Sequence, residues 1–483
     1  MKIILLCGGK GKRLFPLSRE HYPKQFIPIF NGNSLFELTL ERFSQNDDIY
    51  VITNKISSSF LLNFRKNCKV DYKIIYEPVS KNTAASLEYG LQFFDDEDII
   101  GVFPVDHLVN DIENFQKCIK KALEFVENSI VLIGIRPDRV ETRFGYIEYK
   151  NNDVISFKEK PDYETAKKYI DSGNFLFNGG IFIFKKKVMQ QEMKKHAIDI
   201  YNTGEEIGKQ IKNIEYNFES NLNQFFPDSD LEKAFLKFPS ISIDYAVIEK
   251  TDKLKVIKSE FDWDDLGNID ALFKKIPSKF FSNFEIIDNV RESEIFEYCK
   301  KKDSNNIDEN TQNRIIGLDG KSYGIIGYDN CNVIDTEDSL LIIKNGDSDD
   351  VEKFYNWIEK DKSKSEITKF HKTVLKPWGY YKNLYEIENK YKIKIIKINK
   401  GEQISLQTHQ HREEYWTIID GKGKIIIDDK EYFAEKGKQF FIPKNSRHQA
   451  IASEEEDLLF AEVQMGEILS EDDIIRLQDK YKR

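Results

Sequence analysis

A glycine-rich loop follows the first apolar run of the chain. Residues 3–26 read IILLCGGKGKRLFPLSREHYPKQF, so a short predicted strand leads into Gly8, Gly9 and Gly11. The loop also carries five cations, which are Lys10, Lys12, Arg13, Arg19 and Lys24. Glycine lets a backbone approach phosphate oxygens, while amides and cations neutralise their charge. The loop therefore indicates a site for a nucleoside triphosphate, with a basic surface turn as the simpler alternative.

Two other phosphate-binding motifs do not fit this spacing. A Walker A loop needs glycine six residues before its lysine, and counting back from Lys12 that position is Leu6. A dinucleotide-binding fingerprint that starts at Gly9 needs glycine or alanine at position 14, where Leu14 stands. The loop is therefore of another kind.

A second group of candidate functional residues lies near the C-terminal end. Its members are Gly401, Gln407, His409, Glu414, Gly421, Gly437, Pro443, Asn445 and His448. On a strand, positions 407, 409 and 411 share one face, so an amide oxygen and imidazoles are expected to converge. With Glu414 and His448 they offer nitrogen and oxygen ligands suited to zinc or another divalent transition metal. The alternative is that these histidines are packed or surface residues.

Through about residue 275, short apolar runs alternate with amphipathic segments. Strands are predicted at 3–6, 49–53, 72–76, 99–103 and 130–135, with helices near 34–46, 83–95 and 112–127. Asp162 and Gly173 are expected to begin and end a further helix. The alternation predicts an α/β domain over residues 1–275, with a mostly parallel sheet and the ligand at the carboxyl ends of its strands.

After residue 275 the pattern changes. Short apolar pieces at 284–287, 315–317, 323–326, 333–334 and 340–343 predict a small β connector over 276–345, and the polar run 300–313 predicts a solvated loop. A linker helix is expected over 346–365. Short strands punctuated by glycine, at 391–398, 404–409, 415–419, 424–427 and 439–442, predict an antiparallel barrel over 366–483.

Composition limits the kinds of partner that the chain is expected to bind and indicates where it is located. The 483 residues carry a formal net charge of −10, which argues against nucleic acid or an anionic membrane as a partner. The five cysteines are far apart and show no C-x-x-C spacing, so a reducing cytoplasm is the expected location. The apolar run at 3–7 is too short for a signal peptide, and no run of about 18 apolar residues predicts a membrane helix.

The glycine-rich stretch resembles the signature of sugar-nucleotide pyrophosphorylases in its mannose-1-phosphate guanylyltransferase form, with Phe15 in place of the usual tryptophan. Further motifs of that family follow in the expected order. They are Glu77-Pro78, Asn82-Thr83-Ala84, Pro104–His107, Phe144–Ile147, Phe157–Pro161, Phe177–Gly180, Ser242–Ala246 and Trp263–Gly267. The resemblance covers nearly the whole chain and implies a Rossmann-like nucleotidyltransferase domain.

The C-terminal group has the spacing of the two cupin motifs, with Gln407 where the first histidine usually stands. The string SLQTHQHREEYW at 405–416, preceded by Lys376–Gly379, resembles the type II phosphomannose isomerase domain. In that family a cupin, or jelly-roll, barrel follows a guanylyltransferase domain. The order in this chain is the same.

The first resemblance implies transfer of GMP from GTP to mannose 1-phosphate, which gives GDP-mannose and pyrophosphate. By this resemblance, Arg13 and Lys24 hold the triphosphate and Lys160 meets the sugar phosphate. The residues implied for the hexose hydroxyls are Glu159, Asn178 and Gly145.

Two carboxylates, Asp106 and Asp265, are expected to bind Mg²⁺, a hard ion that takes oxygen ligands. Asp106 could instead cap a helix, and Asp265 could belong to an acidic surface run. Asp264 stands where the family usually has serine, so the choice of ligand among Asp262, Asp264 and Asp265 stays open.

The second resemblance implies interconversion of mannose 6-phosphate and fructose 6-phosphate. A metal held by Gln407, His409, Glu414 and His448 would polarise the substrate carbonyl. His411 and Glu413 are candidate bases, and Arg412 is available for the substrate phosphate or the oxyanion. Arg476 could reach the same site, although a solvent-facing helical arginine is the simpler interpretation.

Two alternatives to a bifunctional enzyme stay open. One keeps the guanylyltransferase and makes the cupin a structural or dimerising metal-binding module. The other is a non-catalytic sugar-nucleotide sensor. The retained metal-binding carboxylates argue against it, because a protein that only binds a sugar nucleotide has little need of them. The predicted partners are GTP, mannose 1-phosphate, mannose 6-phosphate and a second copy of the chain, in a cytoplasmic enzyme of GDP-mannose and polysaccharide biosynthesis.

Overall fold

The computed structural model describes residues 1–9, 11–30, 32–213, 218, 223–276, 295–298, 314–317, 323–326, 330–361 and 364–481. The chain divides into two compact units. The first comprises Met1–Leu14, Pro23–Ser57 and Asn67–Phe280, and the second comprises Phe15–Tyr22, Ser58–Lys66 and Phe281–Arg483. Lys10, the predicted strand at 284–287 and the predicted loop at 300–313 lie outside the described residues.

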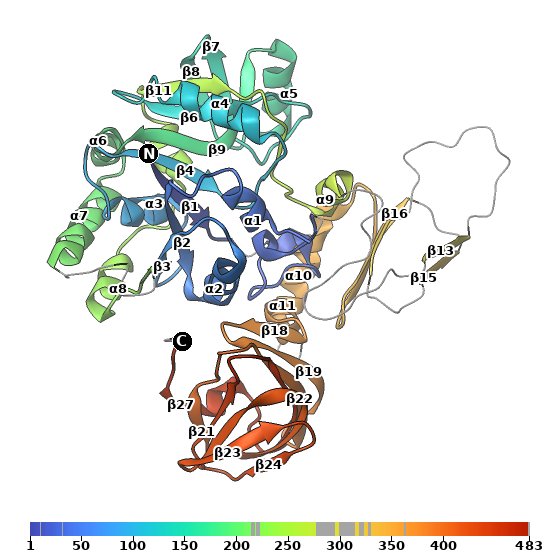
Figure 1. Cartoon of the computed structure of the whole chain (residues 1–483). Helices are drawn as coiled ribbons and strands as arrows, with labels where there is room; N and C mark the ends of the chain where they lie inside the picture. The colour runs from blue at the N-terminus through green and yellow to red at the C-terminus, as the bar shows by residue number, and fades with distance from the viewer. Residues whose placement is uncertain are drawn as a thin grey trace. The chain divides into compact units, whose positions relative to one another are not determined.

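A ten-stranded sheet forms the centre of the first unit (Figure 1). Its strand order is β10-β3-β2-β1-β4-β9-β6-β11-β8-β7. The strands are β1 (Lys2–Cys7), β2 (Asp48–Asn54), β3 (Lys73–Glu77), β4 (Ile99–Pro104), β6 (Ile130–Ile135), β7 (Tyr146–Lys150), β8 (Asp153–Lys158), β9 (Phe175–Lys185), β10 (Gln224–Phe225) and β11 (Leu254–Lys258). The strands predicted between residues 3 and 135 are confirmed, because apolar runs of this kind fill a sheet that is buried on both faces.

The predicted parallel arrangement holds for one half of the sheet. Strands β10, β3, β2, β1 and β4 are parallel, as are β6 and β11. In contrast, the long strand β9 pairs antiparallel with β4, β6 and β7. Strands β7 and β8 form a hairpin around Asn151 and Asn152, and a two-residue connection permits only antiparallel pairing. The sheet is therefore mixed.

Helices surround this sheet (Figure 1). They are α1 (Leu35–Leu40), α3 (Thr83–Leu91), α4 (Ile112–Ala122), α5 (Tyr163–Ser172), α6 (Lys186–His196), α7 (Ile198–Asn213), α8 (Ser229–Phe235) and α9 (Ile269–Lys275). The predicted caps of α5 are confirmed, because Asp162 accepts from the backbone N–H of Thr165 and Gly173 is left-handed. One buried cluster joins Ile4 and Val102 of the sheet to residues of α3, α6, α7 and α8.

The second unit includes two segments from the N-terminal part of the chain, so its composition differs from the contiguous domains that the sequence predicts. In the first segment, Arg19 is fully buried and its Nη2 donates to Asp338 Oδ1 at 2.7 Å. Tyr22 packs its ring against Phe60 and His371. Arg19 is therefore committed to Asp338 and is not one of the cations of the phosphate loop.

The part of the connector that the structure describes is built of short strands followed by helices. They are β13 (Ile295–Tyr298), β14 (Arg314–Ile316), β15 (Tyr323–Ile326), β16 (Cys331–Asp335), β17 (Leu340–Lys344), α10 (Val351–Lys360) and α11 (Ser365–Lys369). The predicted linker helix is thus two helices. Phe15 packs its ring edge against Tyr355 of α10.

The C-terminal strands form a barrel, as predicted (Figure 1). They are β18 (Thr373–Lys376), β19 (Gly379–Ile387), β20 (Tyr391–Ile398), β21 (Leu406–His409), β22 (Arg412–Ile427), β23 (Lys430–Glu435), β24 (Gln439–Ile442), β25 (His448–Ala452), β26 (Leu458–Gly466) and β27 (Ile474–Gln478). The strands predicted at 415–419 and 424–427 are one bent strand, β22. Its register shifts between Ile418 and Asp420, and Gly421 has φ of 80°, so the strand turns without ending.

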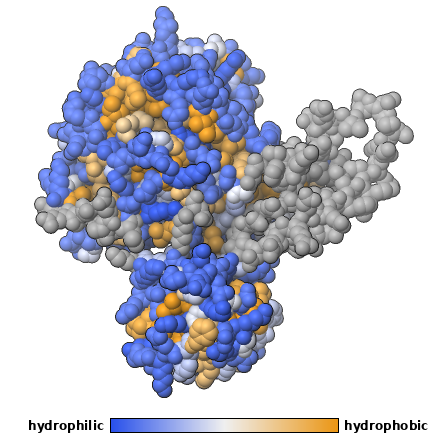
Figure 2. All heavy atoms as spheres, in the orientation of Figure 1, coloured by the Kyte–Doolittle hydropathy of each residue, from blue (hydrophilic) through white to orange (hydrophobic). Residues whose placement is uncertain are grey.

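The face of the molecule drawn in Figure 2 is mostly polar. Hydrophilic residues cover most of the face drawn in Figure 2, and apolar residues gather there in smaller patches. No helix among the described residues is long and apolar enough to cross a membrane.

Gly204 of α7 provides a test of the packing beneath the sheet. A Cβ at this position would overlap the carboxylate of Glu88, which is fully buried and held by Gln92 at 2.7 Å and Gln190 at 2.8 Å. Gly→Ala in a helix normally stabilises by roughly 0.5–1 kcal/mol. We expect Gly204→Ala instead to destabilise by about 1–3 kcal/mol, as overpacking does, and to lower the thermal midpoint. The exposed Glu205→Ala on the same helix is the control, and an unchanged midpoint in Gly204→Ala would contradict the packing.

Candidate active sites

The glycine-rich loop leaves the carboxyl end of β1. Gly9 and Gly11 have φ of 113° and 62°, a region that favours glycine. Among the described residues, a Cβ at Gly8 or Gly9 would meet nothing within 4 Å. A Cβ at Gly11 would lie only 3.0 Å from Lys24 Cβ, so this glycine lets the two ends of the loop approach each other. The backbone at residues 8 and 9 is thus open to a ligand such as a phosphate.

Lys24 connects two other segments of the first unit. Its Nζ lies 3.0 Å from Asp106 Oδ2 and donates to the backbone oxygen of Asp265 at 2.7 Å. A small antiparallel pair, β5 (Leu108–Val109) and β12 (Trp263–Asp264), explains why these segments meet. Asp106 precedes β5 and Asp265 follows β12, so antiparallel pairing places both at the same end. The structure therefore brings together Lys24, Asp106 and Asp265.

The electrostatics favour a charged carboxylate at Asp106. Partial burial opposes its ionisation, but the charge of Lys24 holds the pKa of Asp106 below its ordinary value. Burial lowers the pKa of His107, whose Nδ1 accepts the indole N–H of Trp263 at 3.1 Å. A neutral His107 therefore carries its proton on Nε2, which lies 3.7 Å from Asp106 Oδ1. An anionic Asp106 can serve as an oxygen ligand for Mg²⁺.

Asp262, Asp264 and Asp265 have different surroundings. Asp262 is exposed and pairs with Lys275 at 3.0 Å. Asp264 is buried, and its Oδ1 accepts from the backbone N–H of Leu266 at 2.8 Å, which satisfies a turn. Asp265 follows β12 beside Lys24, and its Oδ2 would lie 2.7 Å from a Cβ at Gly267. Asp265 thus differs from the other two in that its backbone oxygen contacts Lys24, the partner of Asp106.

Glu159, Asn178 and Gly145 meet at another place in the first unit. The backbone N–H of Asn178 donates to Gly145 O at 2.8 Å. A Cβ at Gly145 would lie 2.6 Å from Glu159 Oε2, so only glycine permits this contact. Glu159 is 6% exposed, and its Oε2 has no hydrogen-bond partner among the described residues. A buried carboxylate oxygen without a donor suits the hydroxyl group of a sugar.

Asp244 completes this group, and the sequence analysis did not select it. Asn178 Nδ2 donates to Asp244 Oδ1 at 2.8 Å. Loss of solvation, together with the nearby Glu159, raises the pKa of Asp244 to about 7. Lys160 Nζ lies 2.9 Å from Glu159 Oε1 and is half-exposed. The motif at 242–246 already contained Asp244, but only the fold brings it beside Asn178.

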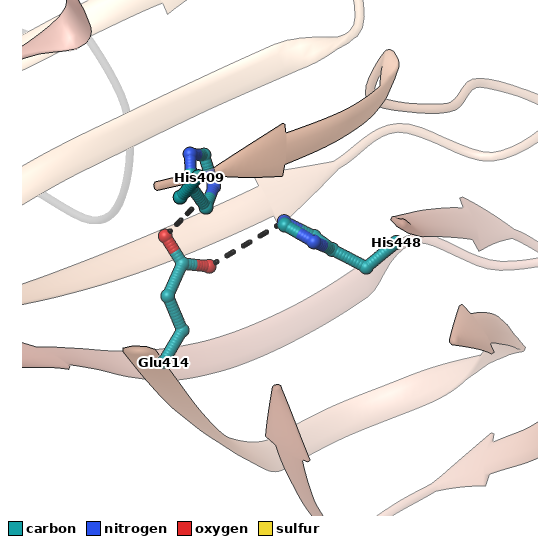
Figure 3. Close-up of side chains that lie close together, drawn as sticks. All are labelled: His409, Glu414 and His448. Carbon is teal, nitrogen blue, oxygen red and sulfur yellow. Dashed lines mark ion pairs between the residues drawn. The ribbon is translucent and has the colours of Figure 1, made fainter. Parts of the chain in front are cut away.

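The barrel contains a cluster of potential metal ligands. One ligand atom each from His409, Glu414 and His448 lies within 4.8 Å of the others, and all three side chains are buried. Glu414 Oε1 lies 3.1 Å from His409 Nε2, and Oε2 lies 3.8 Å from His448 Nε2, as Figure 3 shows. Such a set of imidazole and carboxylate donors fits zinc or a similar divalent ion.

Backbone contacts orient both imidazoles. His409 Nδ1 lies 3.3 Å from Asp473 O, and His448 Nδ1 lies 3.0 Å from Ser446 O. A proton on Nδ1 that is donated to a carbonyl leaves Nε2 available to a metal. Burial lowers the pKa of His448 to about 4, which keeps it neutral at physiological pH. Both rings are therefore ready to act as ligands.

Gln407 lies beside the two imidazoles. Its Nε2 is 3.5 Å from both His409 Nε2 and His448 Nε2, and its Oε1 accepts from Ser405 Oγ at 2.9 Å. Rotation of the amide by 180° would direct the oxygen to the imidazoles and let the nitrogen donate to Ser405. Gln407 thus fits the ligand position that the sequence predicts for it.

Cations and amides surround the carboxylate of Glu414. Burial opposes its ionisation, but the contact with His409 and the charge of Arg412 hold the pKa of Glu414 well below its ordinary value. Arg412 Nε donates to Glu414 Oε1 at 3.0 Å. In contrast, burial and the nearby Glu414 raise the pKa of Glu462 to about 8. Glu414 is therefore the ionised member of this carboxylate pair.

Two side chains of the barrel lie elsewhere than the sequence predicts. His411 does not share the ligand face, because β21 ends at His409 and His411 follows in an exposed bend. Its backbone N–H donates to Asp473 Oδ1 at 3.2 Å. Arg476, interpreted as a helical surface residue, is on β27 instead and lines the same pocket as Gln407 and Glu414. The alternation of side chains along a regular strand predicts neither the bend at His411 nor the strand β27.

Comparisons with known proteins match both parts of the chain. The model of the nucleotidyl transferase family matches residues 2–279, and that of the mannose-6-phosphate isomerase C-terminal domain matches residues 362–479. A mannose-1-phosphate guanylyltransferase of Klebsiella pneumoniae is 31% identical and covers 99% of both chains. The chain belongs to the mannose-1-phosphate guanylyltransferase family.

Two further relatives support this assignment. The alginate biosynthesis protein AlgA of Pseudomonas fluorescens is 30% identical over 99% of this chain and 96% of its own length. A solved structure from Thermus thermophilus, named mannose-1-phosphate geranyltransferase, has a TM-score of 0.58 and 25% identity and covers 74% of this chain and 99% of its own. This guanylyltransferase family member is thus an enzyme in which a nucleotidyltransferase domain precedes a domain of the isomerase type.

The histidines of the barrel give a matched test of the metal site. We expect His409→Ala to lower the affinity for Zn²⁺ or Co²⁺ by about 10- to 100-fold or more, because it removes an oriented imidazole. His411→Ala should bind the metal as the unaltered protein does, since its side chain is exposed. Metal content after dialysis against graded chelator measures both. Equal metal retention in the two variants would contradict the ligand assignment.

Proposed function

We propose that this enzyme transfers GMP from GTP to mannose 1-phosphate and that its barrel interconverts mannose 6-phosphate and fructose 6-phosphate. The observation that carries the first part is the meeting of Lys24, Asp106 and Asp265 beside an open glycine-rich loop. The names of the full-length relatives support the same substrates. The barrel cluster of two imidazoles and a carboxylate supports the second part.

In the transfer, a phosphate oxygen of the sugar attacks the α-phosphorus of GTP in line, and pyrophosphate leaves. The open backbone at Gly8 and Gly9 and the cations Arg13 and Lys24 would hold the triphosphate. Glu159 and Asn178 would orient the hexose while Lys160 meets its phosphate. A Mg²⁺ held by Asp106 and Asp265 would supply charge neutralisation across the reacting phosphates.

In the isomerisation, a proton moves between C1 and C2 of the sugar phosphate. Gln407, His409, Glu414 and His448 would hold a divalent metal, which supplies polarisation of the carbonyl oxygen. Arg412, fixed by Glu414, lies 3.4 Å from His409 Nε2, so its charge is available to an oxyanion beside the metal.

Assays of the full-length protein test both parts. Release of pyrophosphate from GTP and mannose 1-phosphate, and formation of fructose 6-phosphate from mannose 6-phosphate, are the expected results. Transfer without isomerisation in the metal-loaded protein would favour a structural or dimerising barrel. Binding of GDP-mannose without either turnover would favour a sensor.

Lys160 should act on the sugar phosphate. We expect Lys160→Ala to raise the KM for mannose 1-phosphate by roughly 10- to 150-fold with little change in the KM for GTP, because one charge-assisted phosphate contact is lost. Lys158→Ala is the control, since Lys158 lies two residues away and pairs with Glu249 at 3.0 Å. A rise confined to the KM for GTP would assign Lys160 to the triphosphate instead.

Asp265 should act mainly in the transition state. We expect Asp265→Asn to reduce kcat of the transferase by at least about 100-fold, because the amide loses the negative charge that a metal between the phosphates requires. Asp262→Asn is the matched control, since that carboxylate is exposed and pairs with Lys275 at the end of α9. The isomerase activity of each variant reports whether the protein is folded. Similar losses of kcat at both positions would rule out a specific role for Asp265.

A further inference from the structure

A pocket in the barrel contains more cations than the metal cluster requires. Gln407, Arg412 and Glu414 line it together with Lys376, Lys394 and Arg476. Arg412 is already engaged, since it donates to Glu414 Oε1 at 3.0 Å and to Ser470 O at 2.9 Å. The remaining three cations come from β18, β20 and β27, which are separate strands. Their meeting in one pocket therefore needs its own explanation.

Lys394 is the most unusual of these cations. It is only 4% exposed, yet its Nζ lies 3.7 Å from Glu471 Oε1 and 3.8 Å from Oε1 of Glu462, the carboxyl group with the raised pKa. Both distances exceed those of hydrogen bonds. Burying an ammonium without close acceptors is costly. The ammonium also lies 4.8 Å from the centre of the Tyr381 ring, a contact that compensates only part of that cost.

Glu471 faces all three cations without closing on any of them. Its carboxylate oxygens lie 3.6 Å from Arg476 Nη2, 3.7 Å from Lys394 Nζ and 3.9 Å from Lys376 Nζ. Partial burial opposes its ionisation, but these cations hold the pKa of Glu471 at about 2. Its oxygens therefore lie beyond hydrogen-bond distance of both Lys394 and Arg476. A group with more oxygens and more charge would fit better.

The same pocket offers an uncharged donor. Trp378 lines it and is 5% exposed, and its Nε1 has no acceptor among the described residues. An indole N–H that is buried normally finds an acceptor. A tetrahedral anion in the pocket could provide one.

We propose that Lys376, Lys394 and Arg476 form the subsite for the phosphate group of the isomerase substrate, and that Glu471 occupies the place of that phosphate in its absence. The inference rests on the proposed isomerase function and assigns the phosphate to residues other than Arg412. A phosphomonoester dianion has three terminal oxygens, one for each cation, and Glu471 moves aside when it binds. The sugar carbonyl then points towards Gln407 and Glu414, the two proposed metal ligands that line the same pocket.

Inorganic phosphate is the first probe, used on the full-length, metal-loaded protein with GDP-mannose at saturation so that the transferase site is occupied. We expect Lys394→Met to weaken phosphate binding, measured by calorimetry, by roughly 10- to 100-fold. Glu471→Gln should tighten it several-fold, because it removes the competing negative charge. Lys397→Met, on the same strand with its ammonium 3.2 Å from Asp457, is the matched control and should bind phosphate unchanged.

The kinetic measurement uses mannose 6-phosphate with the same variants, each checked for bound metal. Lys394→Met should raise the KM for mannose 6-phosphate by the same factor, while kcat falls less. Free mannose, which has no phosphate group, should inhibit the variant no more strongly than it inhibits the unaltered protein. Unchanged phosphate affinity in Lys394→Met, or weaker binding in Glu471→Gln, would overturn the subsite. Absence of isomerisation in the unaltered protein would instead overturn the proposed function, and the phosphate titration would still decide the subsite.

Discussion

The two contacts of the Lys24 ammonium connect the segments that form the candidate transferase site. The ammonium bonds to the carboxylate of Asp106 and to the backbone oxygen of Asp265, which are separated by more than a hundred residues of sequence. The short β5–β12 pair holds those two segments in register. A triphosphate would offer Lys24 a stronger anionic partner and would release Asp106 for a metal. Under the proposed function, the nucleotide and the metal would replace this internal ion pair.

In the barrel, too, the charge of a carboxylate is balanced by neighbouring side chains. Glu414 is surrounded by His409, His448 and Arg412, and its ionised state is maintained by the contact with His409 and the charge of Arg412. A divalent ion entering between the imidazoles and the carboxylate would take over that stabilisation. Because the second nitrogen of each imidazole faces a backbone carbonyl, the rings need not turn to receive the ion. Both sites thus hold charges that are balanced internally before any ligand binds.

The sequence predicted those features that depend on residues close together in the chain, such as strands and helix caps. The apolar runs predicted β1, β2, β3, β4 and β6, and the caps of α5 followed from Asp162 and Gly173. The histidines and Glu414 were found because two motifs fix their spacing. Asp244, Lys394 and Glu471 were not found, because each acquires its role from a neighbour on another element. The antiparallel course of β9 and the continuous strand β22 likewise depend on pairing partners that no local pattern contains.

The division into units adds a constraint that contiguous domains would not have. Arg13 and Lys24 belong to the first unit, whereas residues 15–22 between them belong to the second. The chain between the two cations is fixed by the buried bond of Arg19 to Asp338 and by the packing of Tyr22 on Phe60. Residues 15–22 are therefore held by contacts that lie within the second unit, although they follow Arg13 and precede Lys24 in the sequence.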